Sequence, residues 1–170
     1  GNNTNSTVIG VTPEYSLVRN VSVENGSFIS ENQLRNMGRV AVLGPTVAED
    51  LFGENNPIGK SIRVNRMNFK IIGVIKTKGS SGFFNPDDVV FVPLSTMQKI
   101  LAGDDSLSTI SISVLNKNLM PEVRDRATAL LISKHRVSLE SPDFSIVSQA
   151  DILGALTQVT TTFTVFLASI

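Results

Sequence analysis

Three residues of this chain, Gly59-Lys60-Ser61, match the end of a nucleotide-binding P-loop and raise the question of ATP chemistry. A P-loop has four residues between its glycines, so that successive backbone N–H groups can wrap the phosphates. Here five residues separate Gly53 from Gly59, and Glu54 stands where glycine should be. The loop also follows an expected helix and enters an expected strand, the reverse of the P-loop order. The sequence therefore predicts a shaped loop before a hairpin and no nucleotide site.

Two pairs of adjacent carboxylates, Asp87-Asp88 and Asp104-Asp105, have the chemistry to bind a hard cation or share a proton. No further acid follows at calcium-loop spacing, and neighbours on a strand point to opposite faces. The single histidine, His135, stands in a Lys-His-Arg run at an expected helix C-terminus, where cations suit the helix dipole. With no cysteine and no G-x-S-x-G motif, we predict no catalytic, cofactor-binding or metal-binding residue. A small soluble hydrolase that uses Asp87, Asp88 or His135 is the remote alternative.

Composition narrows the range of functions. The 170 residues hold 15 Lys plus Arg and 15 Asp plus Glu, so the formal net charge is zero. No basic field exists to hold a polyphosphate backbone, which argues against a nucleic-acid partner. A chain of this length can form one domain or two small lobes.

Up to Gly103 the sequence alternates short apolar runs with turn residues, which is the pattern of a small α/β lobe. The β-branched runs predict single strands and one hairpin, over 7–11, 39–44, 60–75 and 89–94. Phe83 and Phe84 lie on the Gly- and Ser-rich loop after the hairpin. They either fold back onto the hairpin or meet a partner or a membrane surface, so we keep them as a candidate partner contact.

Residue types also mark where helices and turns begin. Thr46 is expected to cap a helix over 47–52, with Glu49 three residues on completing a capping box. Gly53 is a natural end for that helix. Three further signals are a turn at Asn25-Gly26, a polar linker from Ser30 and a helix cap at Ser95 or Thr96.

The final third of the chain predicts a strand-helix-strand unit. Apolar residues alternate with serines over 108–116, as in a strand buried on one face, and 143–148 forms the second strand. Between them 120–136 is an expected helix with Pro121 in its first turn. Its inward stripe is expected to comprise Val123, Ala127, Leu130 and Leu131.

A last helix is expected to open at Asp151 and run to Ile170. Its final 14 residues are uncharged and grow more apolar, but a bilayer span needs about 20 such residues. The segment is therefore either the first turns of a membrane helix or an amphipathic core helix.

The order of these pieces resembles one family. The run VAVLGPTVAEDLFGENNPIGKSIRVNRMNFKIIGVI is similar to a segment of the extracytoplasmic domain of MacB/FtsX-like ABC transporter permeases. The similarity continues through DDVVFVPLSTMQKILAG, SLSTISISV, LLISKHR and DFSIVSQADILGALTQVTTTFTVFLASI. It covers nearly the whole chain from about Thr7 onward, and the joint order of the pieces is more specific than any one of them.

The resemblance implies an α+β fold in three parts. Residues 7–103 would be a small α/β insertion lobe, and 104–150 a porter-like strand-helix-strand unit. Residues 151–170 would be a stalk helix that runs into the start of the second transmembrane helix, near Thr161. The first porter unit would lie before Gly1, which leaves the porter sheet of this chain incomplete.

The resemblance also implies a function. The domain would stand on the extracytoplasmic side of the inner membrane and couple ATP hydrolysis on a cytoplasmic ABC ATPase to export of a substrate. It would hold no cofactor and no catalytic residue itself. Its partners would be a second permease copy, the ATPase, the membrane through its last helix, and an adaptor with an outer-membrane channel. Lipoprotein release and control of cell-wall hydrolases by protein contact are alternatives within the same family.

The last helix would carry the coupling. A continuous helix is stiff over tens of ångströms, so motion in the membrane would pass directly to the external lobe. The residues that we expect to carry it are Asp151, Leu153, Leu156 and Val159.

Overall fold

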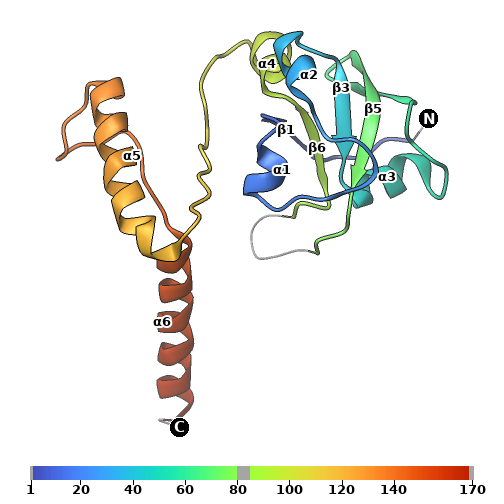
Figure 1. Ribbon diagram of the computed structural model, residues 1–170. Helices are drawn as coiled ribbons and strands as arrows, with labels where there is room; N and C mark the ends of the chain where they lie inside the picture. The colour runs from blue at the N-terminus through green and yellow to red at the C-terminus, as the bar shows by residue number, and fades with distance from the viewer. Residues whose placement is uncertain (1, 80–84, 169–170) are drawn as a thin grey trace. The chain divides into compact units, whose positions relative to one another are not determined.

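The computed structural model describes residues 2–79 and 85–168 and divides into two compact units (Figure 1). Unit 1 comprises residues 1–112 and unit 2 comprises residues 113–170. The boundary falls inside 108–116, the first strand expected for the porter-like unit. Phe83 and Phe84, the candidate partner contact, lie outside the described residues.

Unit 1 is built on a mixed six-stranded sheet. Its strand order is β1-β6-β3-β5-β2, and β4 forms a hairpin with β5. The β1–β6 and β3–β5 pairs are parallel, whereas β6–β3, β5–β2 and β4–β5 are antiparallel. The strands are β1 (Thr7–Val11), β2 (Val23–Gly26), β3 (Val40–Leu43), β4 (Ser61–Val64), β5 (Met67–Ile75) and β6 (Val89–Pro93).

Both faces of this sheet are covered, because successive strand residues point to opposite sides and the central strands are apolar throughout. On one face, β3 and β5 pack against α3 and η1 in a core that includes Leu43, Phe69 and Ile71. On the other face, Phe91 lies under Tyr15 of α1 and Phe28, in tilted ring contacts. The helices of unit 1 are α1 (Tyr15–Val18), α2 (Glu31–Arg35), α3 (Pro45–Phe52), α4 (Leu94–Thr96) and the π-helix η1 (Met97–Ala102).

All the strands expected before Gly103 are confirmed, but several turns and caps are not. Asn25-Gly26 belongs to β2, which has a register shift beside β5 between Val23 and Asn25 and in which Gly26 has a φ of 84°. The linker expected from Ser30 is α2, which begins with a Ser30–Gln33 capping box. The signal for this helix, S-x-x-Q, stands in the sequence.

The other predicted caps are also wrong. The helix of residues 45–52 begins at Pro45 rather than after Thr46, because proline fits the first helical position without a side-chain cap. Ser95 and Thr96 do not cap a helix. Their hydroxyls donate to the carbonyls of Leu34 and Gly38, so tertiary contacts use both groups.

Unit 2 contains the 3-10 turn η2 (Lys117–Leu119) and the helices α5 (Met120–His135) and α6 (Gln149–Ala168). The strands expected at 108–116 and 143–148 are not formed in the described part of the chain. Alternating apolar residues define the faces of a strand, but a strand also needs a partner about 4.8 Å away to receive its backbone hydrogen bonds. Neither segment has such a partner among the described residues.

The inward stripe expected on α5 is not buried either. Val123, Ala127 and Leu131 are half-buried, and Leu130 is 59% exposed. Without a sheet beside it in the described residues, α5 has no surface against which to bury this stripe.

Across the described ranges, no helix has the length and apolar character needed to cross a membrane.

Candidate functional site

The start of α6 is held by a reciprocal pair of hydrogen bonds. The backbone N–H of Asp151 donates to the Ser148 hydroxyl at 3.2 Å, and the Ser148 N–H donates to the Asp151 carboxylate at 2.9 Å. This is the geometry of a capping box, with aspartate in place of glutamate, and it satisfies two backbone donors that a helix start leaves free. The first turn of α6 is therefore fixed by its own sequence, S-x-x-D.

Asp151 also joins the two helices of unit 2. Arg124 of α5 approaches the same carboxylate, with its Nη1 3.4 Å from Asp151 Oδ2. The pKa of Asp151 is held below its usual value, first by the backbone and hydroxyl hydrogen bonds with Ser148 and then by the charge of Arg124. Asp151 is thus a charged link between α5 and the start of α6.

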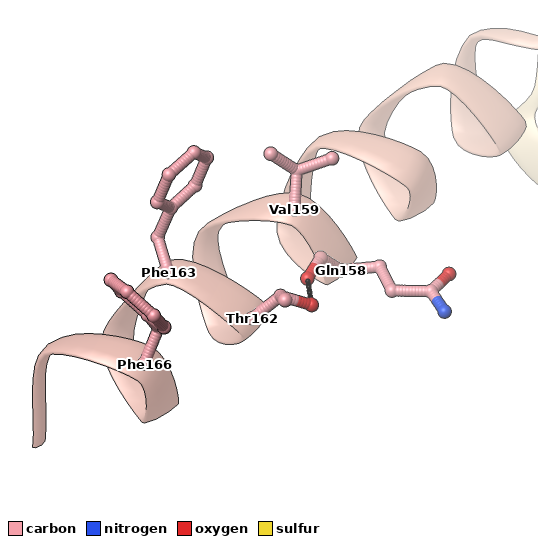
Figure 2. A pocket seen from close by; sticks show the side chains of 5 residues that line it. All are labelled: Gln158, Val159, Thr162, Phe163 and Phe166. Atoms are coloured by element: carbon pink, nitrogen blue, oxygen red, sulfur yellow. Dashed lines mark hydrogen bonds between the residues drawn. The ribbon is translucent and has the colours of Figure 1, made fainter. Parts of the chain in front are cut away.

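Beyond this start, α6 carries an exposed apolar stripe. Its five side chains recur at spacings of four and three residues, which keeps them on one helix face. Each is between 53% and 64% exposed, and the set is Ile152, Leu156, Val159, Phe163 and Phe166. Figure 2 shows Val159, Phe163 and Phe166 projecting toward one side of the helix, where they line a shallow groove with Gln158 and Thr162. No residue from Ile152 to Ile170 is charged, so this face is suited to apolar contact.

Threonines occupy much of the remaining surface of α6. The hydroxyls of Thr160, Thr161, Thr162 and Thr164 each donate to the carbonyl four residues earlier, at 2.9 to 3.0 Å. Because these hydroxyls donate within their own helix, they need no hydrogen-bond acceptor from water or from a partner. The helix therefore presents an apolar stripe beside a polar but internally bonded face.

These contacts place the predicted coupling residues. Asp151 lies at the helix start, and Leu156 and Val159 lie on the stripe. Of Leu153 only the backbone is described. Sequence reasoning missed Ser148, Arg124, Ile152, Phe163 and Phe166, although the S-x-x-D box and the four-three spacing were readable signals. The Arg124 contact had no local signal, since it depends on how α5 meets α6.

The P-loop-like segment has the geometry expected of a shaped loop. It links α3 to β4, and the Gly59 N–H donates to the Ile71 carbonyl at 2.9 Å instead of facing an open cradle. The Lys60 ammonium lies 5.2 Å from the centre of the Phe52 ring, a cation–π contact. A shallow surface hollow beside this loop is lined by Glu49 and Glu54, which would repel phosphate.

Three of the four paired acids serve local structure, whereas Oδ1 of Asp88 is buried with no hydrogen-bond partner among the described residues. Asp87 is 6% exposed, and its carboxylate accepts the backbone N–H groups of Lys78 and Gly79 at 2.9 and 2.8 Å. Asp104 accepts the Ser106 hydroxyl and N–H, which lower its pKa, while Asp105 meets Lys99 at 2.6 Å. Among the described residues, no three His, Asp or Glu side chains gather where they could hold a metal ion.

His135 is engaged in a similar way. Its Nδ1 lies 2.9 Å from both carboxylate oxygens of Asp143, and its ring meets the edge of Phe144. The pair ties the end of α5 to the segment before α6. No nucleophile takes part in this contact, and Asp87 and Asp88 belong to the other unit.

This chain is similar to a known family, to named transporter proteins and to solved structures. The family profile described as the MacB-like periplasmic core domain matches residues 1–130. A macrolide export ATP-binding/permease protein MacB of Bdellovibrio bacteriovorus is 38% identical over 170 residues, which are 99% of this chain and 26% of that protein. The chain thus spans about a quarter of the length of the curated relatives it matches.

Two crystal structures share the fold. The periplasmic region of MacB from Actinobacillus actinomycetemcomitans has a TM-score of 0.73 at 23% identity, over 91% of this chain and 67% of that one. The extracellular domain of the noncanonic ABC-type transporter YknZ from Gram-positive bacteria has a TM-score of 0.70 at 23% identity, over 81% and 68% of the two chains. With the profile match, these findings confirm the resemblance seen in the sequence, and the chain belongs to the MacB-like periplasmic core domain family.

Proposed function

We propose that this chain is the extracytoplasmic domain of an ABC transporter permease and that α6 transmits movement between its external lobe and the membrane. The observation that carries the proposal is the construction of α6. Its start is locked by Ser148 and Asp151 and linked to α5 through Arg124, and its 20 residues form one continuous helix. At 1.5 Å per residue such a helix extends about 30 Å, so a displacement of one end also displaces the other end.

The partners follow from the same proposal. ATP would be hydrolysed on a cytoplasmic domain or subunit, and a second permease copy would complete the transporter. α6 would continue into a membrane span on the extracytoplasmic side of the inner membrane. Because the curated relatives are named macrolide export proteins, a macrolide is the first substrate to test, with a periplasmic adaptor and an outer-membrane channel as further partners.

The proposal is tested by breaking α6 in the full-length transporter. Leu156→Pro removes one backbone hydrogen bond and makes the ring clash with the preceding turn, at a cost of about 3 kcal/mol. We expect ATP hydrolysis to continue while substrate export is lost, measured together in proteoliposomes. Export at the normal rate in the proline variant would refute the transmission of movement through α6.

Two control variants separate helix continuity from other effects. Leu156→Ala trims the same side chain, which is 59% exposed, but keeps the helix. Gly154→Ala meets nothing within 4 Å and raises helix propensity, by about 0.5–1 kcal/mol. Coupling by a stiff helix predicts that both controls export substrate. If Leu156→Ala abolished export as completely as Leu156→Pro, a contact of the Leu156 side chain rather than the stiffness of α6 would be needed for coupling. The proposal that α6 transmits movement as a stiff helix would then be wrong.

A further inference from the structure

Charge is unevenly distributed along this neutral chain. Between residues 55 and 86 every charged side chain is basic, and the set is Lys60, Arg63, Arg66, Lys70, Lys76 and Lys78. The rest of the chain holds the other nine basic residues against all fifteen acidic ones. Net neutrality therefore hides a positive region around the β4–β5 hairpin, and such regions act on partners through their local field.

The hairpin displays part of this charge on one surface. Ile62 and Phe69 are paired across β4 and β5 and point into the core. Alternation then directs Arg63 and Lys70 to the opposite face, where both are exposed. Arg66 stands in the two-residue turn, which holds it at a φ of 68°.

A fourth cation lies at the same end of the sheet. The Lys70 N–H donates to the Arg39 carbonyl at 3.0 Å, which places Arg39, the residue before β3, beside the hairpin. Because Val40 is the residue paired with Lys70, Arg39 flanks the face of Arg63 and Lys70 and does not share it. Arg39, Arg63, Arg66 and Lys70 are named here the basic hairpin surface. Arg63 and Lys70 lie on the paired strands β4 and β5, so the spacing of their backbones is set by the sheet.

Within the described residues, no side chain neutralises these four cations. Five ion pairs occur elsewhere in the chain, and none includes a member of the basic hairpin surface. Other lysines nearby are engaged, because Lys60 lies over Phe52 and Lys78 donates to the Arg19 carbonyl. Like charges repel one another, so gathering four cations at one end of the sheet adds nothing to the stability of the lobe.

The surroundings favour a protein partner over a bilayer. On the strands β4 and β5 themselves, no large apolar side chain is strongly exposed. A membrane-binding surface usually pairs basic residues with apolar groups that insert. Arginine, which supplies three of the four cations, matches carboxylates through its planar fork of N–H donors.

We propose that the basic hairpin surface is a docking site for an acidic segment of a partner protein. The partner is recognised by carboxylates spaced to meet Arg63 and Lys70, with Arg39 and Arg66 at the sides. This role is separate from coupling through α6, since it uses unit 1 and needs no movement of the helix.

The test uses the full-length protein in zwitterionic nanodiscs and a fluorescein-labelled peptide of alternating Glu and Ser, followed by fluorescence anisotropy. A Gln–Ser peptide of equal length is the uncharged comparison. We expect Arg63→Glu/Lys70→Glu to weaken binding of the Glu–Ser peptide at least tenfold. The matched control is Lys117→Glu/Lys134→Glu, which makes the same change in net charge at exposed positions of unit 2 and is expected to change affinity less than twofold.

Three results would overturn the proposal. Equal weakening by both double variants would mean that only net charge is sensed. Unchanged peptide binding in Arg63→Glu/Lys70→Glu would mean that these cations do not bind the peptide, whether or not the variant aggregates. Their role would then be to keep the edge strand β4 from pairing with other chains. Loss of binding to phosphatidylglycerol vesicles, with peptide binding unchanged, would make the surface a lipid site. Unchanged circular dichroism shows that each variant is folded.

Discussion

Gly44, between β3 and α3, is a position at which one added carbon atom would collide with the backbone of a distant segment. A Cβ there would lie 2.3 Å from the carbonyl oxygen of Asp87 and 2.7 Å from its carbonyl carbon. These are backbone atoms of the segment that leads into β6, so no side-chain rotation can relieve the clash. The φ of Gly44 is −68°, a value open to any residue, and the effect of Gly44→Ala is therefore steric alone.

The size of the destabilisation by Gly44→Ala follows from the contacts that must separate to make room for the new methyl group. The Gly44 N–H donates to the Val89 carbonyl at 2.7 Å, and the Thr46 N–H donates to the Asp87 carbonyl at 3.0 Å. Separating the two segments weakens both hydrogen bonds without breaking either, at a combined cost of about 0.5–1.5 kcal/mol. Overpacking adds about 1–3 kcal/mol. We expect Gly44→Ala to lower the unfolding free energy of unit 1 by roughly 2–4 kcal/mol.

Hydrogen exchange followed by mass spectrometry measures this loss in the intact protein. Amides of β3 and β6 should exchange between about 30-fold and about 1,000-fold faster, while amides of α6 in unit 2 stay unchanged. Gly53→Ala is the matched control, because its Cβ would meet nothing within 4 Å and only its backbone, at a φ of 58° and a ψ of −133°, is strained, at about 1–3 kcal/mol. Exchange in β3 and β6 no faster in Gly44→Ala than in Gly53→Ala would refute the steric reasoning.

Two further predictions concern the start of α6 and the P-loop-like segment. The lowered pKa of Asp151 means that its support of the first turn is complete above its unfolded value near 3.8 and is lost as pH falls through the lower folded value. Amide exchange over residues 149–153 should therefore accelerate on acidification beyond the intrinsic change, and Asp151→Asn should remove that dependence; a wild-type and variant pair with identical pH profiles would contradict this. Lys60→Ala should leave ATP hydrolysis by the full transporter within twofold of wild type, because the ammonium rests over Phe52. A loss of tenfold or more in a steady-state phosphate-release assay would show that the loop acts on nucleotide after all.

Local patterns were sufficient for much of unit 1. β3 and the β4–β5 hairpin could be predicted because their β-branched runs are bounded by Gly44 and by the polar turn at Asn65 and Arg66. The turn has positive φ at both central residues, as a two-residue hairpin requires. α5 was equally predictable, from Pro121 at its start and its basic last turn.

Other features depend on contacts between distant segments. The hydroxyls of Ser95 and Thr96 looked like helix caps. Instead they donate hydrogen bonds to carbonyls that lie 61 and 58 residues earlier in the chain. Asp87 stood out in the sequence only as one of two adjacent acids, but it is buried and its carboxylate accepts the backbone N–H groups of Lys78 and Gly79. Such partners become known only when the chain has folded back on itself.

For the candidate coupling helix, the sequence by itself determined the helix, its S-x-x-D start and its four-three apolar stripe, because capping and helical spacing act over a few residues. It also determined that 108–116 and 143–148 have alternating faces. Only the tertiary structure decided that Arg124 meets Asp151 and that neither segment becomes a strand in the described chain. An ion pair between helices and a strand ladder both need a second segment at the right distance, and no local pattern supplies that distance.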